Sequence, residues 1–174
     1  TIEVNLYGTF YMCKHLITHM KKNKYGKIIN LAGGGSGALP GISAYVTSKS
    51  GVIRLTETLA EECINFNINI NSIAPGALNT RLLDEVLDAG ADAVDKKFYE
   101  KALHQISEGG VPLEKGAALC VFLASKNSDG ITGKSLSAVW DSWNEFSKHL
   151  NTIQRTDIYT FRRITPQDRG EDWS

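Results

Sequence analysis

The sequence has little cysteine, no excess of either charge and no long apolar run, and each shortage excludes a class of protein. Cys13, Cys63 and Cys120 are odd in number and far apart, which indicates buried thiols of a reducing compartment, the cytoplasm, instead of a disulfide framework. Nineteen basic residues balance nineteen acidic ones, so no long-range field directs the chain to nucleic acid. No stretch reaches the roughly 18 apolar residues of a membrane span, and we expect no secretory leader and no membrane partner.

Histidine is also sparse, and its spacing gives little support to a metal site. His15 and His19 stand four positions apart on one predicted helix face, a spacing that can bind zinc. No glutamate lies between them and no third ligand is evident. We therefore expect exposed helix residues and no bound metal.

What is present is a hydrophobic share of 42%, which is enough for one globular core. Apolar residues recur at helical spacing over 2–23 and again over 44–65. Short apolar runs at 27–32 and 68–74 are typical of strands buried on both faces. Strand, helix and strand in succession form a parallel crossover unit, so the sequence predicts an α/β fold with helices on both faces of a sheet.

The region 80–112 is charged and predicted to be helical. Gly90 and Gly109 are candidate hinges within it, so we predict a lid. A further helix and a third strand are predicted at 116–125 and 135–139.

A C-terminal extension, 140–174, follows the last predicted strand. Apolar residues recur at helical spacing over 143–153, so the extension is expected to begin as an amphipathic helix and to end irregularly. Trp140, Trp143 and Phe146 resemble a platform for stacking nucleic-acid bases. Because no basic groove accompanies them, a place in the core or in a subunit contact is favoured.

Tyr45 and Lys49 stand one helical turn apart within YVTSK, so both side chains are predicted to lie on one helix face. A phenol with a pKa of ~10 exchanges protons poorly at neutral pH. A nearby ammonium lowers that pKa and makes the pair a candidate acid/base group for a substrate hydroxyl or carbonyl. The spacing alone is a weak signal, because ordinary helix surfaces produce it often.

The context of the pair is more specific than the pair itself. It follows a buried strand and a glycine-rich loop, precedes Pro75-Gly76-Ala77-Leu78-Asn79-Thr80, and is accompanied by Val4-Asn5-Leu6-Tyr7-Gly8 on the first helix. This ordered set, from residue 1 to about residue 139, resembles the short-chain dehydrogenase/reductase family. The resemblance implies a Rossmann-like doubly wound parallel sheet in one domain over 1–139, with its phosphate-binding N-terminal half missing.

The resemblance implies an oxidoreductase that moves a hydride between NAD or NADP and the carbonyl or alcohol carbon of a small molecule. Tyr45 would exchange the proton, Lys49 would hold the nicotinamide ribose, and Asn5 would organise the waters that relay the proton. Further cofactor contacts are implied at Pro75, Gly76, Leu78 and Thr80. Thr80 is also typical of a helix N-cap. A homodimer or homotetramer is implied as well, and the two long predicted helices are apolar enough to form its interface.

One position departs from the family pattern. The usual substrate-orienting serine lies thirteen residues before the tyrosine, where this chain has Ala32. Loss of such a hydrogen-bond donor costs about a hundred- to a thousandfold in rate. Ser36 and Ser43 are candidate replacements, and His104 in the predicted lid is a candidate substrate contact or a solvated helix residue. The alternatives to an enzyme are a binding relative with impaired chemistry and an inactive truncated fragment.

The glycine-rich loop itself is not expected to bind phosphate. Gly33-Gly34-Gly35-Ser36-Gly37 passes through Leu39-Pro40 before the helix, whereas a phosphate-binding loop opens its helix directly. The resemblance places this loop beside the substrate. We expect the chain alone neither to bind nicotinamide nucleotide tightly nor to fold robustly, because the strand at 27–32 would expose an apolar edge.

Overall fold

A parallel sheet forms the centre of the computed structural model, which describes residues 1–173. Its strands are β1 (Gly26–Leu31), β2 (Ile68–Ala74) and β3 (Ser135–Ser137), hydrogen-bonded in that order. Both strand pairs are parallel, with Ile28 opposite Ile70 and Ile73 opposite Leu136. The predicted α/β class and all three strands are confirmed, although β3 ends two residues earlier than expected.

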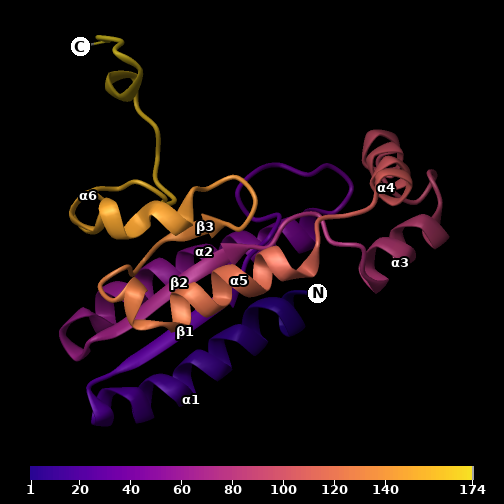
Figure 1. The fold of residues 1–174 in the computed structure, drawn as a ribbon. Coiled ribbons are helices and arrows are strands. Elements are labelled where there is room, and N and C mark those ends of the chain that lie inside the picture. Colours follow the sequence, from indigo (N-terminus) through magenta and orange to yellow (C-terminus); the bar gives the residue numbers. More distant parts are fainter. Residues whose placement is uncertain (174) are drawn as a thin grey trace.

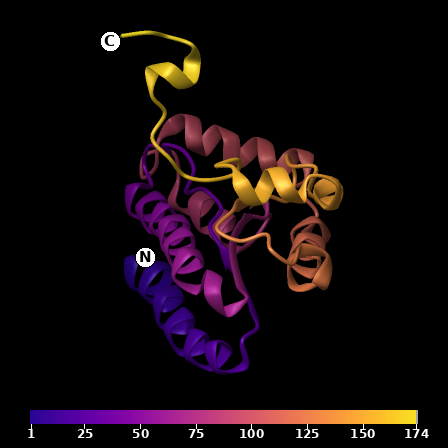
Figure 2. The same ribbon diagram turned by 90° about the vertical axis from the view of Figure 1, so that its left-hand side faces the viewer.

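Helices cover both faces of this sheet (Figures 1 and 2). One face carries α1 (Gly8–Asn23), which a π-helical turn (Glu3–Tyr7) precedes, and α2 (Ser43–Cys63). The other face carries α5 (Leu113–Ala124). Each face has its own apolar core, built around Ile28, Ile68 and Ile70 beneath α1 and α2, and around Ile73, Leu119 and Leu136 beneath α5.

Two helices lie apart from the sheet, at the right of Figure 1. They are α3 (Arg81–Ala89) and α4 (Lys96–Glu108), and they form the region predicted to be a lid. Gly90 and Gly109 end them, both at a φ of 79°, a left-handed conformation that glycine adopts at no steric cost. Short 3₁₀ turns elsewhere connect the larger elements, at Ile64–Phe66 and Lys126–Ser128.

The first part of the C-terminal extension packs on the α5 face of the sheet, and its last residues project away from the body of the protein (Figure 1). It consists of a 3₁₀ turn (Trp143–Lys148), α6 (Leu150–Arg155) and a last 3₁₀ turn (Pro166–Arg169). Phe146 and Ile153 are each 3% exposed, so the apolar positions predicted to face the core do so. Trp140 is 86% exposed, so it does not lie in the core, and its place in a subunit contact stays a prediction.

Two of the three cysteines are buried in the α1 face core. Cys13 and Cys63 are 2% and 0% exposed, and Cys120 is partly buried. Burial raises the pKa of all three thiols, because an apolar environment disfavours the thiolate. Within residues 1–173, no helix is long and apolar enough to cross a membrane, and no group of three or more ligating side chains forms a metal site.

The two outer edges of the sheet differ. The edge of β3 accepts part of the extension, since Ser135 donates its amide to the carbonyl of Tyr159 at 2.8 Å. Along residues 1–173, no strand pairs with the outer edge of β1. The Ala32 amide donates inward to the Ile73 carbonyl at 2.9 Å, so strand alternation turns the amide and carbonyl of Leu31 outward.

We expect the 174-residue chain on its own to self-associate through this β1 edge. Leu31→Pro removes an outward amide only, so it should reduce the association in size-exclusion chromatography and change the melting temperature little. Ala32→Pro removes the amide bonded to Ile73 and should destabilise the chain by about 1–3 kcal/mol. A monomeric, cooperatively melting chain that binds NADPH at micromolar concentration would contradict this expectation.

Candidate active site

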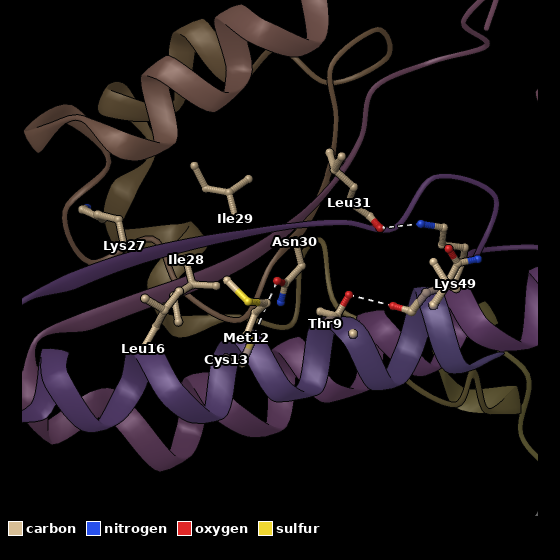
Figure 3. A pocket seen from close by; sticks show the side chains of 13 residues that line it. Thr9, Met12, Cys13, Leu16, Lys27, Ile28, Ile29, Asn30, Leu31 and Lys49 are labelled. Atoms are coloured by element: carbon tan, nitrogen blue, oxygen red, sulfur yellow. Dashed lines mark hydrogen bonds between the residues drawn. The ribbon is translucent and has the colours of Figure 1, made fainter. Parts of the chain in front are cut away.

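The first turns of α2 bring Tyr45 and Lys49 to the carboxyl end of β1. The Tyr45 hydroxyl donates to the Gly33 carbonyl at 3.1 Å, and the Lys49 ammonium donates to the Leu31 carbonyl at 3.0 Å. Figure 3 shows this lysine reaching the outward carbonyl of the strand. The ammonium lies 5.8 Å from the centre of the Tyr45 ring, so the two side chains share one face of the helix.

The electrostatics of the pair differ from the expectation. Burial raises the pKa of the Tyr45 phenol, and burial also lowers the pKa of the Lys49 ammonium. The sequence-based prediction of a lowered tyrosine pKa is wrong for this arrangement, because the ammonium is bonded to the Leu31 carbonyl and desolvation dominates. The phenol is therefore protonated at neutral pH and is suited to donating a proton.

Asn5 reaches α2 from the π-helical turn before α1. Its side-chain amide donates to the Ser48 hydroxyl at 3.0 Å, and this hydroxyl donates to the Tyr45 carbonyl at 2.7 Å. Ser48 is fully buried, so it links Asn5 to the turn that carries Tyr45 and Lys49. Sequence analysis missed Ser48, although its position next to Lys49 within YVTSK was a usable signal. Wide π-helical turns of this kind often occur at functional sites.

The glycine-rich loop packs directly against the same turns of α2. Gly34 has a φ of 86°, and a Cβ at this position would lie 2.9 Å from the Tyr45 ring. Gly35 is buried, and a Cβ there would lie 2.6 Å from the Lys49 carbonyl carbon. The Ser50 hydroxyl donates to the Gly35 carbonyl at 2.7 Å. Only glycine therefore allows this loop to lie so close to the helix backbone.

Ala32, at the usual serine position, is buried, whereas the candidate replacements Ser36 and Ser43 are exposed. Ala32 is 3% exposed and packs with Val52 and Ile53 at the end of β1. Ser36 is exposed in the loop, and Ser43 is exposed at the start of α2.

The segment after β2 meets the glycine loop. A Cβ on Gly33 would lie 3.3 Å from Cδ of Pro75, so the first loop glycine touches this segment. Gly76 has a φ of 105° and is half-buried between two valine side chains, and Leu78 is half-buried. Thr80 occupies the N-cap position of α3, yet its side chain makes no capping hydrogen bond and is exposed.

A pocket lies between these loops and α4. Leu39 comes from the glycine-rich loop, Ala77 from the segment after β2, and Phe98 and His104 from α4. His104 is 68% exposed on its side chain and lies 3.3 Å from Glu108. A second groove runs between α1 and the free edge of β1 and ends at Lys49 (Figure 3).

Tyr45 and Lys49 therefore lie outside the carboxyl end of a parallel strand, which is where open α/β sheets bind their ligands. A family model described as "Enoyl-(Acyl carrier protein) reductase" matches residues 1–138, and the chain belongs to the short-chain dehydrogenase/reductase family. Within it, the chain is 36% identical over 137 residues to a 3-oxoacyl-[acyl-carrier-protein] reductase of Rickettsia bellii, covering 78% of this chain and 54% of that one. It is 34% identical over 143 residues to a D-beta-hydroxybutyrate dehydrogenase of Rhizobium meliloti, covering 78% and 55%.

Solved structures of other proteins in this family have a similar fold. A gluconate 5-dehydrogenase from Burkholderia cenocepacia in complex with NADP and tartrate superposes with a TM-score of 0.65 at 29% identity, over 78% of this chain and 52% of that one. ElxO with NADP bound superposes with a TM-score of 0.60 at 30% identity, over 77% and 53%. The Rossmann-like fold is thereby confirmed, and the chain spans about half the length of the curated relatives it matches.

Gly35→Ala tests the close packing of the loop on α2. The added methyl group meets backbone that cannot move aside, so we expect a loss of about 1–3 kcal/mol in the free energy of unfolding, measured by denaturant titration. Gly37→Ala is the matched control, since a Cβ there meets nothing within 4 Å. Equal stability of the two variants would show that the loop does not pack as described.

Proposed function

We propose that the chain is the catalytic portion of an NAD(P)-dependent oxidoreductase that interconverts a carbonyl compound and its alcohol, with Tyr45 as the acid/base group. One observation carries the proposal. Tyr45 and Lys49 are each anchored to a backbone carbonyl at the end of β1, and Asn5 is tied to the same turn through Ser48. Membership of the short-chain dehydrogenase/reductase family supports the reaction class.

The residues present fit the nicotinamide end of NAD or NADP. Parallel α/β sheets bind ligands outside the carboxyl ends of their strands, where Lys49 and the segment after β2 both lie. Lys49 offers its ammonium to ribose hydroxyls, and Thr80 keeps a hydroxyl that the helix cap does not use. Pro75, Gly76 and Leu78 would run along the nicotinamide. The NADP complexes of the gluconate 5-dehydrogenase and of ElxO support this cofactor class.

The chemistry divides between cofactor and chain. A nicotinamide dinucleotide, when bound, supplies the hydride to the carbonyl carbon. Tyr45 gives its phenolic proton to the carbonyl oxygen, so that the C=O π bond is replaced by one C–H and one O–H bond. Solvent returns the proton to the tyrosine oxygen by way of waters held by Asn5. In the reverse direction, the ionised Tyr45 removes the hydroxyl proton of the alcohol.

The pocket beneath α4 is our candidate for the substrate site. A Cβ on Gly34 would lie 3.6 Å from Leu39 and 2.9 Å from the Tyr45 ring, so Leu39 brings this pocket next to the reacting group. The lining by Phe98 and Ala102 fits the apolar part of a small carbonyl compound, and His104 would contact its polar part. In this proposal α3 and α4 close over the substrate as a lid.

Ala32 favours one alternative, a relative that binds nucleotide and substrate but has impaired chemistry. No hydroxyl at this buried position can hold the substrate oxygen, and Ser36 would have to supply one from the exposed loop. The enzyme proposal stands on the intact Tyr45–Lys49–Asn5 arrangement, which a protein without acid/base chemistry has no need to retain.

We also propose that the protein forms a homodimer or homotetramer in the cytoplasm. Apolar side chains on α1 and on the π-helical turn before it are exposed, among them Val4 (79%), Tyr11 (55%) and Met12 (62%). A homodimer or homotetramer would bury them, because a symmetric interface pairs one apolar patch with its copy. The three free thiols support a reducing, cytoplasmic location.

Turnover of the full-length protein tests the proposal. With NADPH and a panel of ketones and β-keto thioesters, followed at 340 nm, Tyr45→Phe removes one hydroxyl and should lower kcat by about a hundredfold or more. Tyr25→Phe is the matched control and should retain activity, since this exposed tyrosine precedes β1. NADPH binding without turnover in the unmodified protein would instead support the impaired relative, and undiminished turnover in Tyr45→Phe would remove the assigned role of this tyrosine.

A further inference from the structure

The extension contains a segment, residues 156–161, that spans from β3 to α2; we call it the strap. It follows α6 and lies outside the part of the chain that the family model matches, residues 1–138. Figure 1 shows the chain returning past β3 after α6, before its last residues leave the body of the protein. The strap has no regular secondary structure, so its position depends on the contacts that hold it.

Residues around β3 fix the first half of the strap. The Ser135 amide donates to the Tyr159 carbonyl at 2.8 Å, and the buried Lys134 ammonium donates to the Thr156 carbonyl at 2.8 Å. The Tyr159 ring lies 5.3 Å from the Phe146 ring, centre to centre. Tyr159 has a φ of 61°, a conformation that is unfavourable for a bulky side chain and that these contacts must hold in place.

Charged side chains of α2 fix the second half. Glu57 accepts a hydrogen bond from the Phe161 amide, and Arg54 donates to the Phe161 carbonyl. Arg54 and Glu57 also form an ion pair at 2.7 Å. Glu57 is only 9% exposed, and a buried carboxylate without partners is unstable. Both backbone groups of one strap residue are therefore held by one charged pair.

The Phe161 side chain packs against apolar residues that are close in sequence to the residues of the candidate active site. It lies against the cluster of Ala32, Val52 and Ile53, together with Leu6. Ala32 precedes Gly33, whose carbonyl accepts the Tyr45 hydroxyl; Val52 lies three residues after Lys49 on α2; and Leu6 follows Asn5. The residues of the candidate site are thus each close in sequence to a member of the apolar cluster against which Phe161 packs.

We propose that Phe161, Arg54 and Glu57 are positioning residues, through which the strap holds the start of α2 and the end of β1 in the geometry that catalysis requires. The proposal rests on the function proposed above. The strap touches none of the reacting groups and acts through the Ala32–Val52–Ile53 cluster. Small displacements of catalytic groups are costly, since about 1 Å of misplacement can reduce rates by about a hundredfold.

Phe161→Ala in the full-length protein removes the packing and keeps the backbone contacts of the strap. We expect kcat for ketone reduction to fall by about 10- to 100-fold, while the KM for NADPH changes by less than about threefold. Phe161→Leu should retain most of kcat, because the leucine side chain still packs against the Ala32–Val52–Ile53 cluster. Ile158→Ala is the control in the same strap, and its exposed side chain should be dispensable. A kcat within about twofold of the unmodified protein for Phe161→Ala would overturn the proposal.

Hydrogen–deuterium exchange separates this proposal from the proposed function. Amide exchange over residues 43–53 should rise in Phe161→Ala and stay unchanged in Ile158→Ala, whether or not the unmodified protein turns over any ketone. Unchanged exchange over 43–53 in Phe161→Ala would overturn the positioning role even in an active enzyme. If Phe161→Ala does not fold, Phe161→Val gives the same two readouts, because it removes the ring from the Ala32–Val52–Ile53 cluster, leaves a smaller cavity, and keeps Glu57 paired with Arg54.

Discussion

The anchoring of α2 to the carboxyl end of β1 is the interaction on which the candidate site depends. Lys49 and Tyr45 donate to the carbonyls of Leu31 and Gly33, so helix and strand are joined at two points one helical turn apart. The glycine-rich loop can leave β1 and lie against α2 only because Gly35 adds no side chain at that contact. With these contacts in place, the Tyr45 phenol, which we propose as the acid/base group, stands beside the loop that contributes Leu39 to the candidate substrate pocket.

The same anchoring sets the electrostatic state of the pair. The lysine charge is directed to a strand carbonyl, and burial of the phenol disfavours the phenolate, so the pKa of Tyr45 is raised instead of lowered. A protonated phenol fits the direction in which a carbonyl is reduced. Ala32 offers no hydrogen-bond donor where the resemblance to the family implies a serine, so the proposed reaction would depend more strongly on Tyr45.

Much of this could be predicted from the sequence, for identifiable physical reasons. Strands β1 and β2 are short apolar runs between turn residues, and α2 has no proline and a wide apolar face, so local pattern and burial agree. The hydrogen bond from Lys49 to the Leu31 carbonyl could not be predicted, because it depends on the position of α2 along β1, which the sequence pattern does not determine. The strap was also missed, since Arg54 and Glu57 are typical of an exposed helix face until Phe161, more than a hundred residues later, meets them.

The protonation state of Tyr45 can be measured directly in solution. Tyrosine labelled with ¹³C at Cζ, assigned by comparison with Tyr45→Phe, reports the titration of this one phenol by NMR. We expect a pKa above the ordinary ~10 of tyrosine, because burial disfavours the charged phenolate. A pKa below that of free tyrosine would show instead that the ammonium of Lys49 acts on the phenol and not on the Leu31 carbonyl of β1.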